Sequence, residues 1–305
     1  MGNVINMIGG GENVNAEVAT QKTKIELLAK QIASVQLDFN STYVWGKYTA
    51  SGGDLLDYVY STNSSAYPDK GTQDGYYYKR VKPVEDFATS TWADIKAAVQ
   101  AGIGGLDLSK YWSVGDTKSV TLTTGEAIEL QIAGFNHDTY SDGVTAPVTF
   151  IMKDCLNTKA QMNSGEDNTG GYPASAMKTY VETNIYDKLP SGLKAIVAPV
   201  KKKWYTTYNQ ASSLTEDNYN VWLLSEAEVI DSVTQTIGNG EGSKYPIFSD
   251  NASRIKKVNG TANEWWLGSC SSDDIFTFLL VSSDGYVNGD YASGFIGVVV
   301  GLCVR

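Results

Sequence analysis

The chain has 305 residues, of which 42% are hydrophobic and 19% charged, and its formal net charge at pH 7 is -10. This acidic balance argues against nucleic acid or an anionic membrane as a partner, because both require basic protein surface. No stretch is apolar over the length of a bilayer, so we expect no membrane insertion, and the first eleven residues lack the basic region of a secretory signal.

Residues 1–40 combine a glycine-rich start with a heptad pattern. The apolar positions are Val14, Val18, Ile25, Leu28, Ile32 and Val35. One interpretation is a short coiled coil that makes a homo-oligomer, with a trimer favoured. The other is an amphipathic helix that lies on the chain's own domain.

Residues 41–85 form the second predicted segment, in which aromatic residues alternate between glycine, asparagine and proline turn signals. The runs 43–48, 58–60 and 76–80 predict a small three-stranded β module. Such aromatic residues can stack on sugars, but in a sheet this small they more often supply the packing.

Residues 86–305 are expected to fold as one domain. Ser90 and Thr91 precede a predicted helix from Trp92 that closes at 102–105, and a second helix is predicted over 175–187. Strands are predicted over 119–122, 128–134, 148–152, 196–203, 221–224 and 276–281. Two early helices followed mostly by strands indicate an α+β fold rather than alternating βαβ units.

Candidate catalytic chemistry is sparse. The single histidine, His137, stands beside Asp138 but has no second histidine or recognisable nucleophile with it, so a structural role is the favoured interpretation. Acidic pairs at 166–167 and 273–274 match no calcium-loop spacing. Cys155, Cys270 and Cys303 are too scattered for a zinc site and are expected to be free thiols, although Cys270 and Cys303 could pair. We therefore assign no catalytic residue, no metal ligand and no cofactor.

The carboxyl-terminal segment has an unusual residue choice. Between Gly268 and Val304 there is no Lys, Glu, Gln, Met or Trp, while Ser, Gly, Asp, Val, Tyr, Phe and Ile are frequent. Exposed loops and strands normally use Lys, Glu and Gln freely. Random replacement of the adenines in AAC or AAT codons cannot produce the five missing residues, so the composition indicates adenine-directed variation. A Gly/Ser-rich β segment that lacks long side chains by chance is the alternative.

Five motifs in order carry a family resemblance. They are the sequences at 92–95, 132–138, 171–175, 222–226 and 265–269, followed by the ending at 301–303. Together they resemble the C-type-lectin-fold variable proteins of diversity-generating retroelements, and more narrowly their gut bacteriophage members, over about residues 91–305. Gly268 departs from the family pattern, in which the tryptophan pair is followed by Leu-Arg-Ser.

The resemblance implies a C-type lectin-like fold of two helices and paired, mostly antiparallel sheets, which displays a variable ligand-binding segment over 268–300. The positions where the family varies are Ser271, Asp273, Ile275, Phe276, Thr277, Leu280, Ser282, Tyr286, Asn288, Gly289, Asp290, Tyr291, Gly294 and Ile296. The positions that support them are Trp265, Trp266, Leu267, Phe278, Val281, Gly285, Ala292, Gly297, Val298, Gly301 and Cys303. Ile275, Phe276, Leu280 and Ile296 are expected to be exposed, as suits a binding surface.

The function implied is non-enzymatic binding of a bacterial surface protein or glycan by a phage tail-tip or fibre protein, part of the virion and acting outside the host cell. Its other partners would be virion tail proteins and further copies of itself. Two alternatives stay open on the same fold. One is an enzyme like the formylglycine-generating oxidases, which would use Cys270 and Cys303 with copper, and the other is a calcium-dependent sugar-binding lectin.

Overall fold

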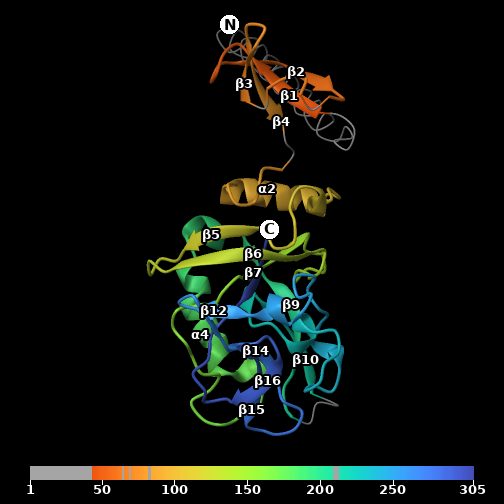
Figure 1. Cartoon of the computed structure of the whole chain (residues 1–305). Coiled ribbons are helices and arrows are strands. Elements are labelled where there is room, and N and C mark those ends of the chain that lie inside the picture. Colours follow the sequence, from red (N-terminus) through yellow and green to blue (C-terminus); the bar gives the residue numbers. More distant parts are fainter. Residues whose placement is uncertain (1–42, 64, 69, 82–83, 209–212) are drawn as a thin grey trace, which may run out of the picture. The chain divides into compact units, whose positions relative to one another are not determined.

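The computed structural model describes residues 43–63, 65–68, 70–81, 84–208 and 213–305 (Figure 1). Contacts divide the chain into two units, Met1–Pro83 and Val84–Arg305. The heptad pattern over 14–35 lies outside the described residues, so the coiled coil stays a prediction.

The first unit contains a four-stranded antiparallel sheet in the order β2-β1-β4-β3. Its strands are β1 Tyr43–Tyr48, β2 Leu55–Ser61, β3 Lys70–Gln73 and β4 Tyr76–Val81. The prediction of three strands was wrong, because the turn at Asp74 and Gly75, both with positive φ, adds β3 as a short hairpin partner of β4. Trp45 is fully buried and packs edge-on against Tyr67, which stacks on Tyr78 at 4.5 Å, so aromatic packing supplies this sheet's small core.

The second unit is a mixed α+β fold built on antiparallel sheets. Its helices are α2 Trp92–Ile103, α3 Gly171–Ala174, α4 Ala176–Asn184, α5 Ser191–Lys194, α6 Glu226–Val229 and α7 Asn251–Arg254, with 3-10 turns at Leu108–Lys110, Tyr186–Lys188 and Asn239–Glu241. Its strands are β5 Thr117–Thr121, β6 Ala127–Phe135, β7 Val148–Met152, β8 Val197–Ala198, β9 Val200–Tyr205, β10 Leu214–Tyr219, β11 Val221–Trp222, β12 Lys256–Val258, β13 Thr261–Asn263, β14 Trp265–Cys270, β15 Thr277–Val281, β16 Val287–Tyr291 and β17 Gly301–Val304.

The two main helices begin where the sequence predicts. Thr91 and Asp94 form a reciprocal capping box at the start of α2, and the Ser175 side chain caps α4. The stripe of Met177, Val181 and Ile185 is buried, which confirms the second predicted helix, although its regular part ends at Asn184.

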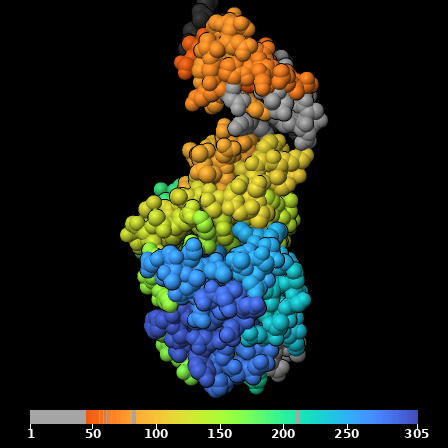
Figure 2. Space-filling model, in the orientation of Figure 1, coloured from red at the N-terminus to blue at the C-terminus, as the bar shows by residue number. Residues whose placement is uncertain are grey.

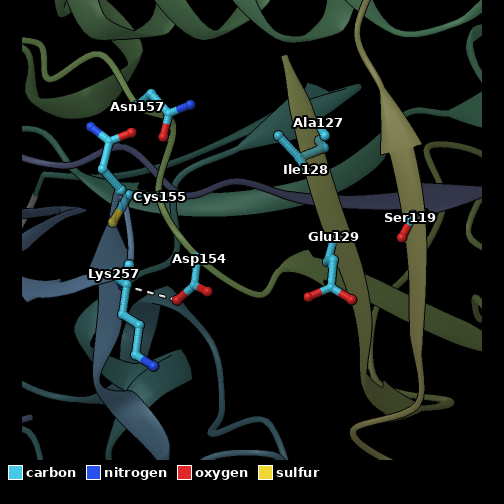
Figure 3. A pocket seen from close by; sticks show the side chains of 10 residues that line it. Ser119, Ala127, Ile128, Glu129, Asp154, Cys155, Asn157 and Lys257 are labelled. Carbon is cyan, nitrogen blue, oxygen red and sulfur yellow. Dashed lines mark hydrogen bonds between the residues drawn. The ribbon is translucent and has the colours of Figure 1, made fainter.

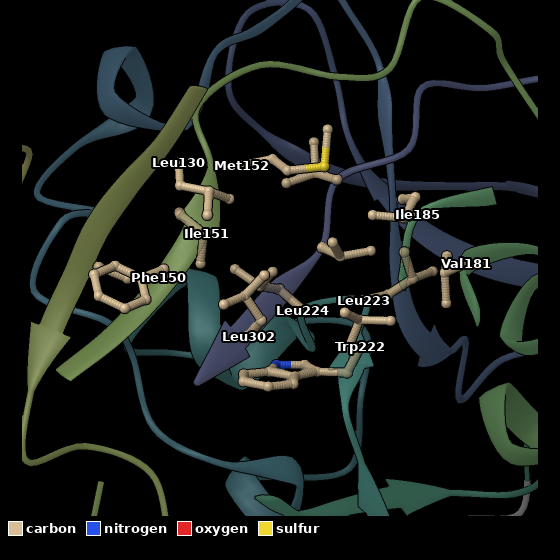
Figure 4. Packing of buried hydrophobic residues seen from close by; sticks show 14 of the residues in the cluster. Leu130, Phe150, Ile151, Met152, Val181, Ile185, Trp222, Leu223, Leu224 and Leu302 are labelled. Atoms are coloured by element: carbon tan, nitrogen blue, oxygen red, sulfur yellow. The ribbon is translucent and has the colours of Figure 1, made fainter. Parts of the chain in front are cut away.

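A six-stranded sheet forms the centre of this unit. Its path is β11-β17-β7-β6-β5, and β8 pairs with β17. Every residue of β7 and β17 is buried. Figure 4 shows how the side chains of these strands meet Val181 of α4, Ile185 at the end of that helix, and Trp222 of β11. The carboxyl-terminal strand therefore lies in the middle of the core.

A smaller antiparallel sheet in the order β14-β15-β16 carries the segment with the unusual composition. Within the second unit it lies at the end opposite α2 (Figure 1). All six residues of β14 are buried, including Trp265 and Trp266, which confirms that the tryptophan pair anchors the core. Since β14 is fixed in the core and β16 is the edge strand, the chain from 271 to 296 extends from the core to the surface.

The presence of glycine at position 268 has a steric explanation. A Cβ atom at this position would lie 2.4 Å from the Trp204 indole, and the Gly268 amide donates to the Leu224 carbonyl over 2.8 Å. An arginine here would displace Trp204 from the core. The packing of β9 against β14 therefore requires a glycine at this position.

Candidate ligand-binding surface

The structure separates the fourteen predicted surface positions into three groups. Six are exposed, namely Asp273, Ile275, Phe276, Tyr286, Asn288 and Tyr291. Five are half-buried, namely Thr277, Ser282, Gly289, Asp290 and Gly294. Three are buried, namely Ser271, Leu280 and Ile296.

The expected exposure of Leu280 and Ile296 was wrong. Leu280 lies in the central strand β15, between Trp266 of β14 and Asn288 of β16, and is 2% exposed. Ile296 forms a backbone bridge with Ala160 and is 3% exposed. Ser271, at 3% exposed, is buried because its amide donates to Thr277 and its hydroxyl accepts from Asp273 at the start of the loop.

Sequence reasoning missed the most exposed large hydrophobic side chain of the described residues. Phe295 is 66% exposed, next to buried Ile296. A partial signal was available, because neighbouring residues in extended chain point in opposite directions, so an exposed Phe295 beside a buried Ile296 was one of the arrangements to expect. The resemblance had placed only Ile296 in the varying set.

Four exposed hydrophobic residues lie in the stretches of chain at the same end of β15 and β16. Thr277 pairs with Tyr291, and the Ala292 amide donates to the Phe276 carbonyl over 2.9 Å. The turn that follows β16 carries Phe295. We call Ile275, Phe276, Tyr291 and Phe295 the aromatic surface. Figure 2 shows the carboxyl-terminal segment, in the darkest blue, at the molecular surface of its unit.

Tyr286 belongs to a different part of the segment. It lies in the turn between β15 and β16, beyond the Val281–Val287 pair. Four residue steps separate that pair from the Thr277–Tyr291 pair, which is roughly 14 Å at about 3.4 Å per residue. The exposed positions therefore form two groups.

Asn168 holds the loop that carries the aromatic surface. Its side-chain amide donates to the carbonyls of Asp274 and Thr277, each over 2.9 Å, and its backbone amide donates to Ile275 over 2.8 Å. Asn168 is completely buried, so these bonds are shielded from water. Asn168 therefore fixes the position of the loop at residues 274–277.

A second loop is fixed by a buried carboxylate. Glu226 accepts hydrogen bonds from the amides of Thr234, Gln235 and Thr236 and from both threonine hydroxyls. The Gln235 carbonyl in turn accepts from the Ser272 amide, and its side chain donates to Val287. The surface segment is thus supported from both sides by ordered loops.

His137 lies in a cleft of about 490 Å³ lined by residues of β9 and the loop around Gly240. Its Nε2 lies 3.1 Å from the Ser243 hydroxyl, while its Nδ1 lies 3.8 Å from Asp138. Asp138 is committed elsewhere, because it accepts from Lys202, Thr149 and Tyr245. These contacts favour a structural role for His137.

Lys202 is the centre of that buried charge cluster. It forms ion pairs with Asp138 and Glu228, and all three side chains are buried. Burial opposes charge, but the two carboxylates outweigh it and raise the pKa of Lys202. The pKa of Asp138 is correspondingly held below its usual range against the effect of burial, chiefly by Lys202.

A smaller cavity of about 220 Å³ lies between β6 and β12 (Figure 3). Cys155 lines it, and the Lys257 amide donates to Asp154 over 2.8 Å at its edge. Burial raises the pKa of the Cys155 thiol to about 12, which makes it a poor nucleophile at neutral pH.

All three cysteines are buried free thiols. Cys270 belongs to β14 and Cys303 to β17, and the Cys303 sulfur lies 3.5 Å from the Thr149 hydroxyl. Burial raises the pKa of both thiols above the usual range. Within the described ranges, no cluster of three or more His, Cys, Asp or Glu side chains is arranged to hold a metal ion.

The fold and the surface define a mixed α+β domain with antiparallel sheets that presents ordered aromatic loops on a buried frame. Among the helices described, none is long and apolar enough to span a membrane. A family model described as a domain of unknown function, DUF6273, matches residues 146–305. The match covers just over half of the chain, so the chain belongs to the DUF6273 family. No curated protein and no solved structure matches it.

Proposed function

We propose that this chain is a non-enzymatic ligand-binding protein whose Val84–Arg305 unit has a C-type lectin-like fold of the kind varied by diversity-generating retroelements. In this proposal it is a phage tail-tip or fibre adhesin, assembled with virion tail proteins, that engages a ligand on the bacterial surface. The aromatic surface makes the main contact.

The observation that carries the proposal is the exposure of large hydrophobic side chains in an ordered segment. Ile275, Phe276, Tyr291 and Phe295 are 40%, 43%, 53% and 66% exposed, respectively. Their loops are held by Asn168, Gln235 and the β15–β16 pairing. Rigid exposed aromatic residues lose little conformational entropy on binding, and they dominate binding surfaces for that reason.

The glycines of the segment support a division between frame and variable surface. A Cβ atom on Gly285 would lie 1.9 Å from the Asn251 carbonyl oxygen, and one on Gly297 would lie 2.7 Å from the Glu264 carbonyl oxygen. The nearest atoms to Gly289 and Gly294 are instead side-chain ends of Thr277 and Asp290. Gly285 and Gly297 are thus constrained by backbone, whereas Gly289 and Gly294 of the variable set are constrained first by side chains of other members of that set.

The oxidase-like alternative has less support. Cysteines that bind copper or carry out redox chemistry react as thiolates. Cys270 and Cys303 lie in strands of different sheets, and burial raises the pKa of each. The calcium-lectin alternative has less support, because the described residues contain no group of three or more His, Cys, Asp or Glu side chains arranged to hold a metal ion.

The proposal is tested with the variant Phe276→Ala/Tyr291→Ala/Phe295→Ala of the full chain. Binding of the labelled chain to a panel of intact gut bacterial strains is measured together with thermal unfolding. We expect binding to any strain that retains the parent chain to fall by at least about tenfold, which corresponds to about 1.4 kcal/mol. The melting temperature should stay close to that of the parent, because the three side chains are exposed.

The matched control is Val114→Ala/Leu214→Ala, which removes exposed hydrophobic side chains outside the segment. This control should bind like the parent. Equal binding by the triple variant and the control would contradict the proposal, as would unfolding of the triple variant. An independent check is the coding DNA, in which the proposal requires a nearby repeat that differs at adenines.

A further inference from the structure

Carboxylates surround the aromatic surface. Asp273 and Asp274 precede Ile275 directly, and Asp290 precedes Tyr291. Glu166 and Asp167 precede Asn168, whose backbone amide is bonded to Ile275. Neither 160–177 nor 268–304 contains a lysine or an arginine. The charged residues within these two ranges are therefore all acidic, and the lysines nearest to them in the sequence are Lys159, which precedes the Ala160 that bridges Ile296, and Lys178.

These carboxylates are ordered but not neutralised. Asp274, Asp290 and Asp167 each accept a backbone amide of their own loop, at 2.7, 2.8 and 2.8 Å. None of the five acidic residues forms an ion pair with any described residue. Local hydrogen bonds hold the carboxylates beside the hydrophobic side chains, where each keeps one oxygen without a described protein partner.

Three exposed acidic residues elsewhere in the same unit do have cationic partners. Asp187 pairs with Lys194, Asp231 with Lys244, and Asp142 with Arg305. The contrast matters because a cluster of unpaired like charges lowers stability through mutual repulsion. A cationic partner would remove that repulsion, so the charge pattern favours such a partner.

The edge of β16 is poorly suited to the addition of another strand. The side chains of Asn288 and Asp290 accept the outward amides of Gly289 and Tyr291, each within 2.9 Å. Side chains that bond to their own backbone compete with strand pairing at a sheet edge. Contact with a partner is therefore expected through side chains of the surface.

We propose that the partner of this surface is a lysine- or arginine-rich polypeptide segment, an inference that rests on the proposed function. Its cationic groups lie over the rings of Phe276, Tyr291 and Phe295 and pair with Asp273, Asp274 and Asp290. A guanidinium or ammonium group suits both contacts, because it is attracted to an aromatic face and forms charge-assisted hydrogen bonds with carboxylates. Such charge complementarity also sets partner specificity and speeds association.

The test uses the full chain and immobilised peptides of equal length and equal aromatic content in three sets: Lys/Arg-rich, uncharged polar, and Asp/Glu-rich. We expect retention by the first set and at least about tenfold weaker retention by the other two. Raising the salt concentration should weaken the retained signal, because exposed charges are screened.

The decisive variant is Asp273→Asn/Asp274→Asn/Asp290→Asn, in which each Asn keeps an oxygen acceptor for the loop. It should lose at least about tenfold of its affinity for the Lys/Arg-rich peptides. A control with the same change of charge, Asp187→Asn/Glu216→Gln/Asp217→Asn, alters exposed carboxylates outside the segment and should bind like the parent.

The outcomes separate this inference from the proposed function. Binding that requires the three aromatic residues but shows no preference for basic peptides, or binding unchanged in the triple Asn variant, would overturn the cationic partner and leave the binding function standing. Charge-dependent binding that survives Phe276→Ala/Tyr291→Ala/Phe295→Ala would overturn the role of the aromatic surface. Loss of binding in both decisive variants but in neither control supports both.

Discussion

The surface segment, residues 271–296, differs in side-chain burial from the strands on either side of it. β14 and the run from Gly297 to Val304 are buried at every residue, while the chain between them exposes Ile275, Phe276, Tyr286, Tyr291 and Phe295. Both regions are ordered. The difference shows that exposure here does not come from a loose chain end, because the segment is itself anchored in the core by residues 278–281 of β15 and by Ala292.

Charge follows the same division. In the buried part of the second unit, which we call the frame, Lys202 forms ion pairs with Asp138 and Glu228. Its ammonium group lies 4.2 Å from the centre of the Trp222 ring. At the surface segment, the carboxylates have no cationic partner among the described residues. Buried charges require partners within the chain, whereas exposed ones can await a partner from outside.

The largest expected effect breaks the frame. Lys202→Met leaves Asp138 and Glu228 buried without their cation and should lower the free energy of unfolding by about 4 kcal/mol. Lys203→Met is the matched control, since Lys203 is exposed and lies 3.8 Å from Glu216. It should change the free energy by less than about 0.5 kcal/mol. Denaturant unfolding of both variants measures the difference, and similar values would show that the buried cluster is not essential to the frame.

A second prediction sharpens the boundary between the two regions. Ile296→Ala removes a buried side chain and should cost about 3 kcal/mol, whereas Phe295→Ala should change the free energy of unfolding by less than about 0.5 kcal/mol. The two residues are neighbours, so the comparison depends on side-chain direction alone. Thermal or denaturant unfolding decides it. A destabilising Phe295→Ala would mean that this ring belongs to the core.

Much of the fold could be predicted from local patterns. The Thr91 and Ser175 caps, the stripe of Met177 and Val181, and the apolar run of β7 each determine an element from neighbouring residues. The small sheet was counted incorrectly because β3 is a four-residue strand with only half-buried and exposed residues, so it has no hydrophobic signal.

The surface was only partly predictable. Composition and the family resemblance located the segment. The alternating direction of neighbouring side chains could have suggested Phe295 rather than Ile296 as the exposed residue. The support from Asn168 could not be predicted, because it joins residues more than one hundred positions apart. The ion-pair partners of Lys202 could not be predicted for the same reason, since Asp138 and Glu228 are distant from it in the chain. Contacts of this kind depend on the completed fold rather than on spacing.

The third prediction concerns the buried carboxyl group of Glu241, which contacts Ser269 of β14 at the base of the surface segment. Glu241 is buried, accepts the Tyr205 amide over 2.8 Å and contacts the Ser269 hydroxyl, which also accepts the Glu226 amide over 2.8 Å. Burial raises the pKa of Glu241 from its ordinary value of 4.5 to about 8. The folded protein therefore keeps a proton that the unfolded chain releases between these two pH values, and this group makes stability fall as pH rises through that window.

Glu241→Gln imitates the protonated carboxyl and removes this titration. Relative to the parent, its free energy of unfolding should rise by about 3 kcal/mol between pH 5 and pH 8, because each of the three pH units contributes at most about 1.4 kcal/mol. Denaturant unfolding at several pH values measures the gain, with the exposed Glu216→Gln as the control that should follow the parent throughout. Parallel curves for the parent and Glu241→Gln would show that Glu241 is ionised in the folded protein, and that the support next to Ser269 carries a charge which the segment above it must accommodate.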